Sequence, residues 1–166
     1  MTKDTAHYYE DKDAYAYKLY KENKFCRKSR ALICKDKHLL LIKINYPSGD
    51  YHYLFPGGGV DEGESAKMAA VREAYEEYGV RVKSIKYLGR QYYNYNIDYN
   101  GERFKSKRID NYYICEYISE DKLAKFGIQG EFDRDDRVYE KVALDVESIK
   151  AIPYKKLNDI DKKNYD

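Results

Sequence analysis

The first third of the chain alternates between apolar runs and short polar interruptions, a pattern typical of neighbouring strands. Residues 29–35 and 38–44 are rich in Leu and Ile and are separated by Asp36 and Lys37, which predicts two strands joined by a tight turn. Residues 47–50 are Pro-Ser-Gly-Asp and predict a second turn. Residues 51–55 then form an aromatic, apolar segment that leads into a run of glycines. We therefore expect this region to form part of a sheet.

Residues 65–78 follow a helical pattern instead. Ser65 is a favourable N-cap residue, and Gly79 is a typical helix terminator. Apolar residues recur every three or four positions, which predicts one core-facing stripe made of Met68, Val71, Tyr75 and Tyr78. Val71→Asp should therefore place an unpaired charge in the core and unfold the protein.

The opposite side of this predicted helix is acidic. At about 100° per residue, three carboxylates project away from the apolar stripe: Glu73, Glu76 and Glu77. We expect the small residues Ala66, Ala69 and Ala70 to lie on the same side, so that nothing bulky blocks a ligand. The simplest interpretation of such a cluster is an exposed, solvated face on which Arg72 pairs with Glu76.

A glycine-rich loop before the helix favours a functional interpretation. Residues 56–59 are Pro-Gly-Gly-Gly, which cannot continue a regular element, and the acidic residues Asp61, Glu62 and Glu64 follow directly. Carboxylate oxygens gathered on one face are the ligands that Mg²⁺ or Mn²⁺ prefers, together with phosphate oxygens. We therefore expect a catalytic site for one of these two metals.

Loop and helix together follow the spacing G-x5-E-x7-R-E-U-x-E-E-x-G-U over residues 58–80, where U is aliphatic. Seven fixed positions would match by chance in roughly one chain of this length in a million. The segment resembles the signature of the Nudix hydrolases. The resemblance implies an α/β fold, an α/β/α sandwich around a mixed β-sheet, and it covers roughly residues 29–150.

The resemblance also implies roles for individual residues. The principal metal ligands would be the helix glutamates Glu73, Glu76 and Glu77. A backbone carbonyl near Gly58 would complete the shell, Glu64 would lie close to the metal, and Arg72 would hold the glutamates by ion pairing. The implied reaction is hydrolysis of a diphosphate linkage in a nucleoside diphosphate joined to another moiety. The general base stays open between this helix and a later segment that contains Glu131, Asp133, Asp135, Asp136 and Glu140.

An alternating pattern returns after the helix. Inward and outward positions alternate along residues 93–99, where every second residue is one of Tyr93, Tyr95, Ile97 and Tyr99. Asn100-Gly101 is a strong hairpin signal, and the return strand should run through Phe104 and Ile109 to residues 112–117. Residues 138–146 resemble the last sheet strand of the family, and residues 157–163 predict a short terminal helix.

Two interpretations of the hairpin stay open. Its tyrosines could stack on a base while nearby cations meet phosphates: Arg90, Arg103, Lys105 and Arg108. We favour packing of the tyrosines on the sheet, because the chain contains 21 tyrosines in all. His52, just before the glycine loop, could face a substrate or be structural.

Composition limits the setting and the partners. The chain has 31 basic and 29 acidic residues and a net charge of +2, so a dedicated nucleic-acid partner is not expected. Three scattered cysteines suit neither a disulfide framework nor a zinc site. We find no secretory leader pattern and no apolar run near the ~20 residues that a membrane helix needs, so we expect a cytoplasmic protein.

We expect two parts: a polar, tyrosine-rich extension over residues 1–28, with a short helix around residues 14–20, and a Nudix domain over residues 29–166. The expected partner is a small-molecule nucleotide, either a nucleoside triphosphate or a nucleotide sugar such as ADP-ribose. The alternatives are a hydrolase of capped or triphosphorylated RNA 5′ ends, a non-catalytic nucleotide sensor and an isomerase of the same fold. A homodimer stays open.

Overall fold

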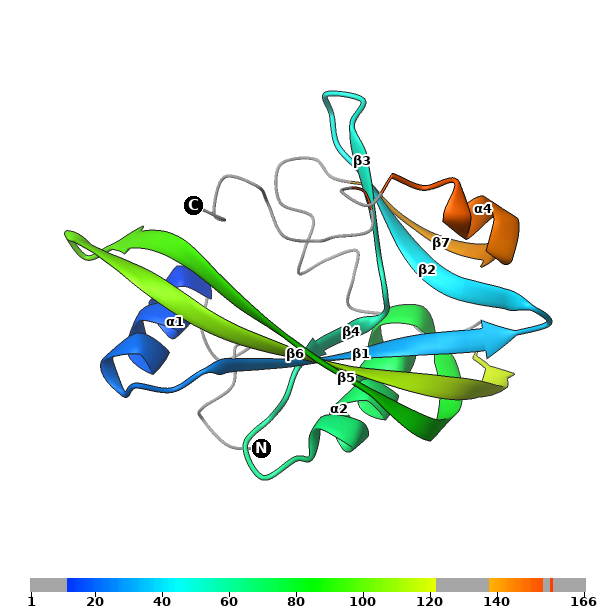
Figure 1. Cartoon of the computed structure of the whole chain (residues 1–166), viewed down its shortest axis with the longest axis horizontal. Helices are drawn as coiled ribbons and strands as arrows, with labels where there is room; N and C mark the ends of the chain where they lie inside the picture. Colours follow the sequence, from blue (N-terminus) through cyan, green and yellow to red (C-terminus); the bar gives the residue numbers. More distant parts are fainter. Residues whose placement is uncertain (1–11, 122–137, 154–155, 157–166) are drawn as a thin grey trace.

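The computed structural model describes residues 12–121, 138–153 and 156 (Figure 1). The described helices and strands, in chain order, are α1 (Lys12–Lys21), β1 (Cys26–Lys35), β2 (His38–Asn45), β3 (Tyr51–Leu54), β4 (Gly57–Gly59), α2 (Ala66–Glu73), a π-helical turn (Ala74–Tyr78), β5 (Val80–Tyr99), β6 (Glu102–Glu120), β7 (Val138–Asp145) and α4 (Val146–Lys150).

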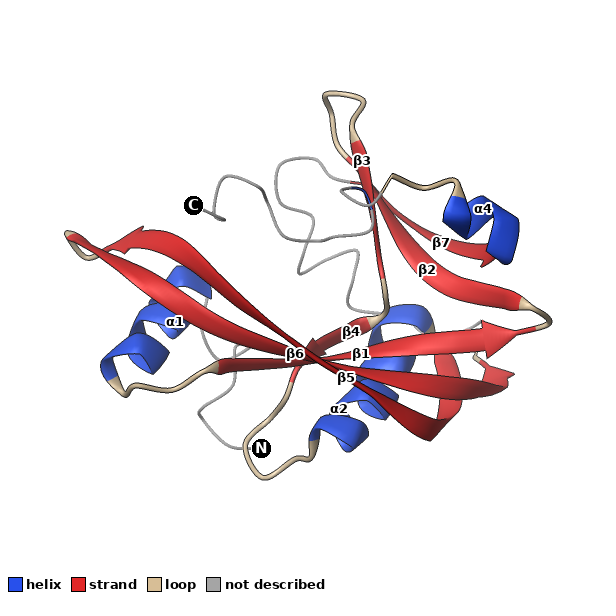
Figure 2. Ribbon diagram, in the orientation of Figure 1, coloured by secondary structure: helices blue, strands red, loops and turns tan. Residues whose placement is uncertain are grey.

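These strands form one mixed sheet in the order β3-β2-β1-β6-β5, with β4 paired to β1 and β7 paired to β2 (Figure 2). β1 runs parallel to β6, and all other described pairs are antiparallel. The expected turn at Asp36 and Lys37 is confirmed, and both residues have the positive φ that a tight two-residue hairpin turn requires. The structure confirms the α/β class and the mixed sheet.

The helix α2 begins and ends as expected, but its buried face differs from the prediction. The Ser65 hydroxyl accepts a hydrogen bond from the Met68 backbone N–H, and Gly79 closes the helical segment at a φ of 83°. The expected core residue Met68 is 61% exposed. Of the expected stripe, Tyr78 is buried and Val71 packs against the core, and the other residues that pack on the sheet are the alanines Ala66, Ala69, Ala70 and Ala74.

A close approach of α2 to β1 explains this correction. The Ser29 hydroxyl of β1 donates a 2.6 Å hydrogen bond to the Ala66 carbonyl, so only small side chains fit between helix and strand. The alanines therefore do not line an open acidic face. The last turn also widens, because the Gly79 N–H reaches the carbonyl oxygens of both Ala74 and Tyr75. Such π-helical turns are frequent at functional sites.

The predicted hairpin is present as β5 and β6, with its turn at Asn100 and Gly101. Register shifts interrupt its pairing, and the skipped residues Ile85, Leu88 and Ile118 are exposed hydrophobics. Beyond these shifts the expected alternation holds. Of the hairpin tyrosines, Tyr95 and Tyr99 pack against protein, as we favoured.

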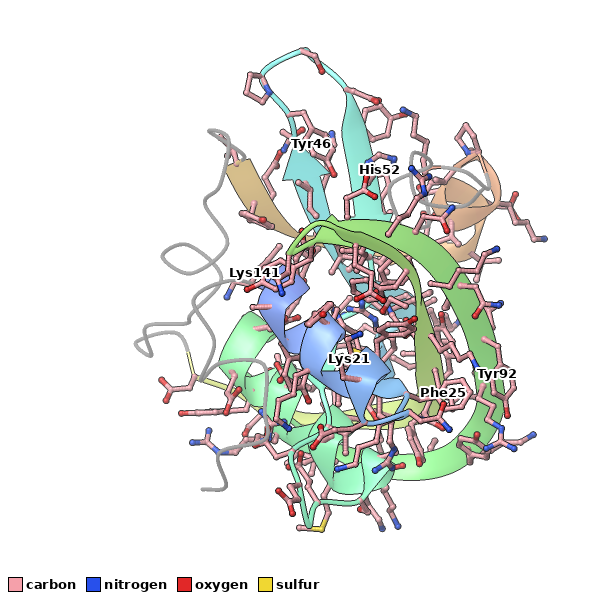
Figure 3. All side chains as sticks on the ribbon, turned by 90° about the vertical axis from the view of Figure 1, so that its left-hand side faces the viewer. Lys21, Phe25, Tyr46, His52, Tyr92 and Lys141 are labelled. Atoms are coloured by element: carbon pink, nitrogen blue, oxygen red, sulfur yellow. The ribbon has the colours of Figure 1, made fainter. Side chains whose placement is uncertain are left out.

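The N-terminal helix α1 covers the far end of this hairpin. Ala16 and Tyr17 of α1 pack with Ile97, Tyr99 and Phe104, and Figure 3 shows α1 within the curve of the two strands. Because side chains alternate along a strand, Phe104 faces α1 while Cys115 faces the α2 core on the other side of the sheet. The sheet is thus covered by a helix on each face.

Other expectations stand as follows. The last strand is confirmed as β7, and α1 confirms the short N-terminal helix. The expected helix over residues 157–163 lies outside the described residues. The division into residues 1–28 and 29–166 stays a prediction. None of the described helices combines the length and apolar character required to cross a membrane.

Candidate active site

The glycine loop lies directly against both the sheet and the acidic helix. Gly57 of β4 pairs with Arg30 of β1, and a Cβ atom on Gly57 would overlap the carbonyl oxygen of Ser29. A Cβ atom on Gly58 would lie 2.5 Å from both Cδ and Oε1 of Glu73. A side chain at Gly57 would therefore collide with the backbone of β1, and a side chain at Gly58 would displace the Glu73 carboxylate.

Arg72 is the centre of the hydrogen-bond network on this side of α2. Its Nε donates to Glu64 at 2.8 Å, and its Nη1 donates to Glu73 at 3.0 Å and to Glu76 at 2.9 Å. Its Nη2 donates to the Gly59 carbonyl at 2.8 Å and to Glu64 at 3.0 Å. Arg72 therefore ties the loop to the helix. These bonds, above all those to Glu64, raise the pKa of Arg72 further.

Glu64 and Glu73 differ in their electrostatic surroundings although Arg72 contacts both. Burial opposes ionisation of Glu64, but hydrogen bonds from Arg72 and from the Asp61 backbone N–H outweigh it and lower the pKa of Glu64. Burial raises the pKa of Glu73, and the positive charge of Arg72 offsets only part of that increase. Glu64 is thus held as a carboxylate, whereas ionisation of Glu73 is opposed.

Glu77 is the most strongly perturbed carboxyl group of the site. We expected it to be exposed, but it is half-buried and accepts a 2.9 Å hydrogen bond from the Gly57 backbone N–H. Burial, followed by the negative charge of Glu73, raises the pKa of Glu77 to about 8. The correction has the same cause as that of the helix face, because the glutamates flank the buried alanines of α2 rather than oppose them.

The donor set at this loop fits a divalent cation. Glu73 and Glu77 bring two poorly solvated carboxylates together, and the pKa of each is raised, so a positive ion would relieve the cost of ionising both. Gly58 leaves the space beside Glu73 clear of side-chain atoms. Among the described residues no three carboxylate, imidazole or thiol groups form a ready metal cluster, and Arg72 instead bridges Glu64, Glu73 and Glu76.

The remaining predicted site residues are exposed or lie outside the described residues. The Glu76 side chain is 53% exposed and contacts Arg72 from the solvent side. Glu140 lies in β7, is exposed and accepts a hydrogen bond from the Asn45 amide at 2.6 Å. The other general-base candidates lie outside the described residues: Glu131, Asp133, Asp135 and Asp136.

We did not predict a buried charged group that adjoins the loop. Arg30 donates to the Phe55 carbonyl at 3.3 Å and lies 3.6 Å from Asp110, which also pairs with Arg108. All three charged residues are at most 6% exposed. The positive charge of Arg30 also acts on the site, where it opposes the rise in the pKa of Glu73 and of Glu77. The only signal in the sequence was an arginine within an otherwise apolar strand segment, which alternation alone assigns to a solvated face.

Comparisons with known proteins identify the family of this chain. A NUDIX domain model matches residues 25–160. Over 40 residues the chain is 60% identical to the "Putative 8-oxo-dGTP diphosphatase YtkD" of Bacillus subtilis, covering 24% of this chain and 25% of that protein. Over 98 residues it is 29% identical to an RNA pyrophosphohydrolase of Pasteurella multocida, covering 55% of this chain and 48% of that protein.

A solved structure shows the same fold over a longer range. A NUDIX hydrolase from Nitrosomonas europaea superposes with a TM-score of 0.55 at 22% identity, covering 77% of each chain. By contrast, the matched part spans at most about half the length of the two curated relatives above. The family model, however, covers most of this chain, from β1 to beyond α4. The chain belongs to the NUDIX domain family.

Proposed function

We propose that this protein is a metal-dependent hydrolase that cleaves a diphosphate linkage in a nucleoside diphosphate joined to another moiety. The observation that carries the proposal is the pair of desolvated carboxylates, Glu73 and Glu77, held against the backbone of Gly57 and Gly58. Two such groups destabilise a fold unless a cation binds them, so their retention side by side favours a metal site over a structural role.

Each residue then has a role that its contacts support. Glu73, Glu77 and the Gly58 carbonyl would hold Mg²⁺ or Mn²⁺, and Arg72 orients Glu73. A bound ion would neutralise charge on the diphosphate and lower the pKa of the attacking water. Glu64, whose pKa is lowered, stays ionised near neutral pH and is a second acidic group at the same loop. Glu76, which the family resemblance also implies as a ligand, is the most exposed of these glutamates and would have to exchange its contact with Arg72 for the metal.

The proposed substrate is a small nucleotide, either a nucleoside triphosphate or a nucleotide sugar. The name of the Bacillus subtilis relative refers to 8-oxo-dGTP, and its match is short but 60% identical. Hydrolysis of triphosphorylated RNA 5′ ends is the second candidate, because several relatives are named RNA pyrophosphohydrolases and one matches over 98 residues. The net charge of only +2 favours the small nucleotide.

The test is a phosphate-release screen with Mg²⁺ or Mn²⁺ over nucleoside triphosphates, nucleotide sugars, dinucleoside polyphosphates and triphosphorylated RNA. Pyrophosphatase or phosphatase would convert each product to free phosphate. We expect metal-dependent cleavage of one class and its loss in Glu77→Gln. Metal binding without cleavage of any class would contradict the proposal and favour a nucleotide sensor.

A further inference from the structure

Four cationic side chains and two aromatic rings form an exposed patch at the β5 edge of the sheet. They come from three neighbouring segments: Phe25 just before β1 and Arg27 in β1, Lys105 and Lys107 in β6, and Arg90 and Tyr92 in β5. All six side chains belong to exposed residues. We call these six residues the Tyr92 patch.

The Tyr92 patch lies on the sheet face that carries α2. Arg27 pairs with Ile109, and Ile109 pairs with Tyr92, so these three side chains point to the same face. Ser29, two residues after Arg27, points the same way, and its hydroxyl donates to the Ala66 carbonyl of α2. The helix α1 packs on the opposite face. The patch is therefore an uncovered part of the face that holds the glutamates.

The patch is also continuous with the glycine loop. The Val60 backbone N–H donates to the Arg27 carbonyl at 3.0 Å, and Gly59 pairs with Lys28. Next to β1 in the sheet come β6 and then β5, so Tyr92 lies two strand spacings, roughly 10 Å, from Arg27. A polynucleotide whose 5′ end lies at the loop would therefore reach the patch within its next few nucleotides.

The charges of the patch are not neutralised by protein groups. Among the described residues, none of its four cations forms an ion pair with a carboxylate, whereas Arg103, nearer the hairpin turn, pairs with Asp98. Residues 80–97 contain four basic residues and no acidic one. The net charge of +2 is an average over the whole chain and conceals this local excess of positive charge.

The two rings are exposed and held in place by the cations. Phe25 is 41% exposed and Tyr92 57% exposed, and their rings meet edge-on with centroids 6.2 Å apart (Figure 3). The Lys107 ammonium group lies 5.7 Å from the Phe25 centroid, and the Arg90 guanidinium lies 5.3 Å from the Tyr92 centroid. Exposed rings interleaved with cations are the combination that stacks unpaired bases and meets the phosphates between them.

We propose that the Tyr92 patch binds single-stranded RNA, with bases stacked on its rings and phosphates against its cations. The choice of RNA rests on the proposed function, in which a triphosphorylated RNA 5′ end is the second candidate substrate. A duplex keeps its bases stacked inside and offers no base face to Phe25 and Tyr92. An acidic peptide would need only the cations and would leave the two rings unused.

The experiment measures anisotropy of a fluorescein-labelled RNA of about ten nucleotides with a 5′ hydroxyl group, in EDTA. Such an RNA has no triphosphate, so its binding does not depend on the metal site. Lys105→Gln/Lys107→Gln should weaken binding and reduce the slope of log K against log salt by about 1.4, because each phosphate contact of a single strand contributes about 0.7. The control Lys37→Gln/Lys150→Gln removes two exposed lysines elsewhere and should bind as the wild type does.

Tyr92 tests the contribution of stacking. Tyr92→Leu should bind the RNA about tenfold more weakly, whereas Tyr92→Phe keeps the ring and should bind like the wild type. Equal binding by the wild type and Lys105→Gln/Lys107→Gln would overturn the proposal, and so would equal binding by the wild type and Tyr92→Leu. Polyglutamate that competes as well as unlabelled RNA would also overturn it, and would point to an acidic protein partner.

Phosphate release from nucleoside triphosphates separates this inference from the proposed function. Lys105→Gln/Lys107→Gln should hydrolyse them at the wild-type rate, because neither lysine contacts the glutamates or the glycine loop. RNA binding that depends on the patch, in a protein that hydrolyses no nucleotide or RNA end, would support the patch and contradict the hydrolase assignment. Hydrolysis by a protein that does not bind the RNA would overturn the patch and leave the metal site intact.

Discussion

Replacing Gly58 with alanine should separate the chemistry of the site from the stability of the fold. The added methyl group would lie 2.5 Å from Cδ and Oε1 of Glu73, whereas carbon atoms in contact rest about 3.5 Å apart. The Glu73 carboxylate would therefore have to move by about 1 Å. A displacement of this size among catalytic groups costs on the order of 100-fold in rate, so we expect kcat to fall by about that factor.

The neighbouring glycines provide matched controls. The fold of Gly58→Ala should survive with a stability loss below about 1 kcal/mol, because the crowded group is the end of a flexible side chain. A Cβ atom on Gly59 would meet nothing within 4 Å, so Gly59→Ala should keep both turnover and stability. Gly57→Ala would press a methyl group against the Ser29 carbonyl and should lose about 3 kcal/mol of stability.

Two assays are needed for this series. Steady-state phosphate release measures kcat, and urea unfolding measures the free energy of unfolding for each variant. The reasoning would be refuted if Gly58→Ala turned over at the wild-type rate, since the Glu73 carboxylate would then not need its present position. It would also fail if Gly59→Ala lost as much activity as Gly58→Ala.

Three further predictions concern α2. Glu77→Gln should reduce turnover by orders of magnitude. Because burial raises the pKa of Glu77 from 4.5 to about 8, its ionisation removes stability as the pH rises through that range, so the Tm of the variant should exceed that of the wild type above pH 8 and match it below pH 4.5. A pH-independent Tm difference would contradict this. Arg72→Met should lower the free energy of unfolding by about 2 kcal/mol in urea, because Glu64 and Glu73 lose their positively charged partner. An unchanged unfolding midpoint would show that these contacts do not stabilise the fold. Ala70→Asp should fail to fold, whereas the stability of Met68→Asp should stay within about 0.5 kcal/mol of wild type in melting followed by circular dichroism. The opposite order would show that Met68 lies in the core and Ala70 outside it, as the sequence pattern predicted.

Local signals predicted the ends of elements well. Ser65 as N-cap, Gly79 as terminator and the turn at Asn100 and Gly101 all depend on a few neighbouring residues and are confirmed. Such features follow from the preferred backbone conformations and local hydrogen bonds of a few residue types, which can be recognised in a sequence. The same holds for the spacing that ties Arg72 to the glutamates of its own helix.

The buried face of α2 could not be predicted in this way. Hydrophobicity placed Met68 inside and the alanines outside, but the 2.6 Å bond from Ser29 to Ala66 leaves no room for a large side chain. The close approach is a property of the packed helix and strand and not of the helix alone. The same packing explains why Glu77, which we expected to be exposed, is half-buried.

Long-range contacts account for the remaining differences. The buried Arg30–Asp110 pair joins residues 80 positions apart, and neither residue carries a local sign of its partner. The exposed Ile85, Leu88 and Ile118 follow from register shifts that alternation cannot indicate. In this molecule the sequence pattern predicted the glycine loop and the acidic helix, whereas the contacts between strands depend on the sheet register.

The measurement that tests the central claim most directly is a calorimetric titration of Mn²⁺ into the wild type and Glu77→Gln at pH values below and above 8. We predict saturable binding by the wild type, with release of about one proton per ion below pH 8 and less above it, because the raised pKa keeps Glu77 protonated until the ion binds. Glu77→Gln should bind weakly and release no proton. Equal binding by both proteins, or no binding by the wild type, would contradict a metal site at Glu73, Glu77 and Gly58.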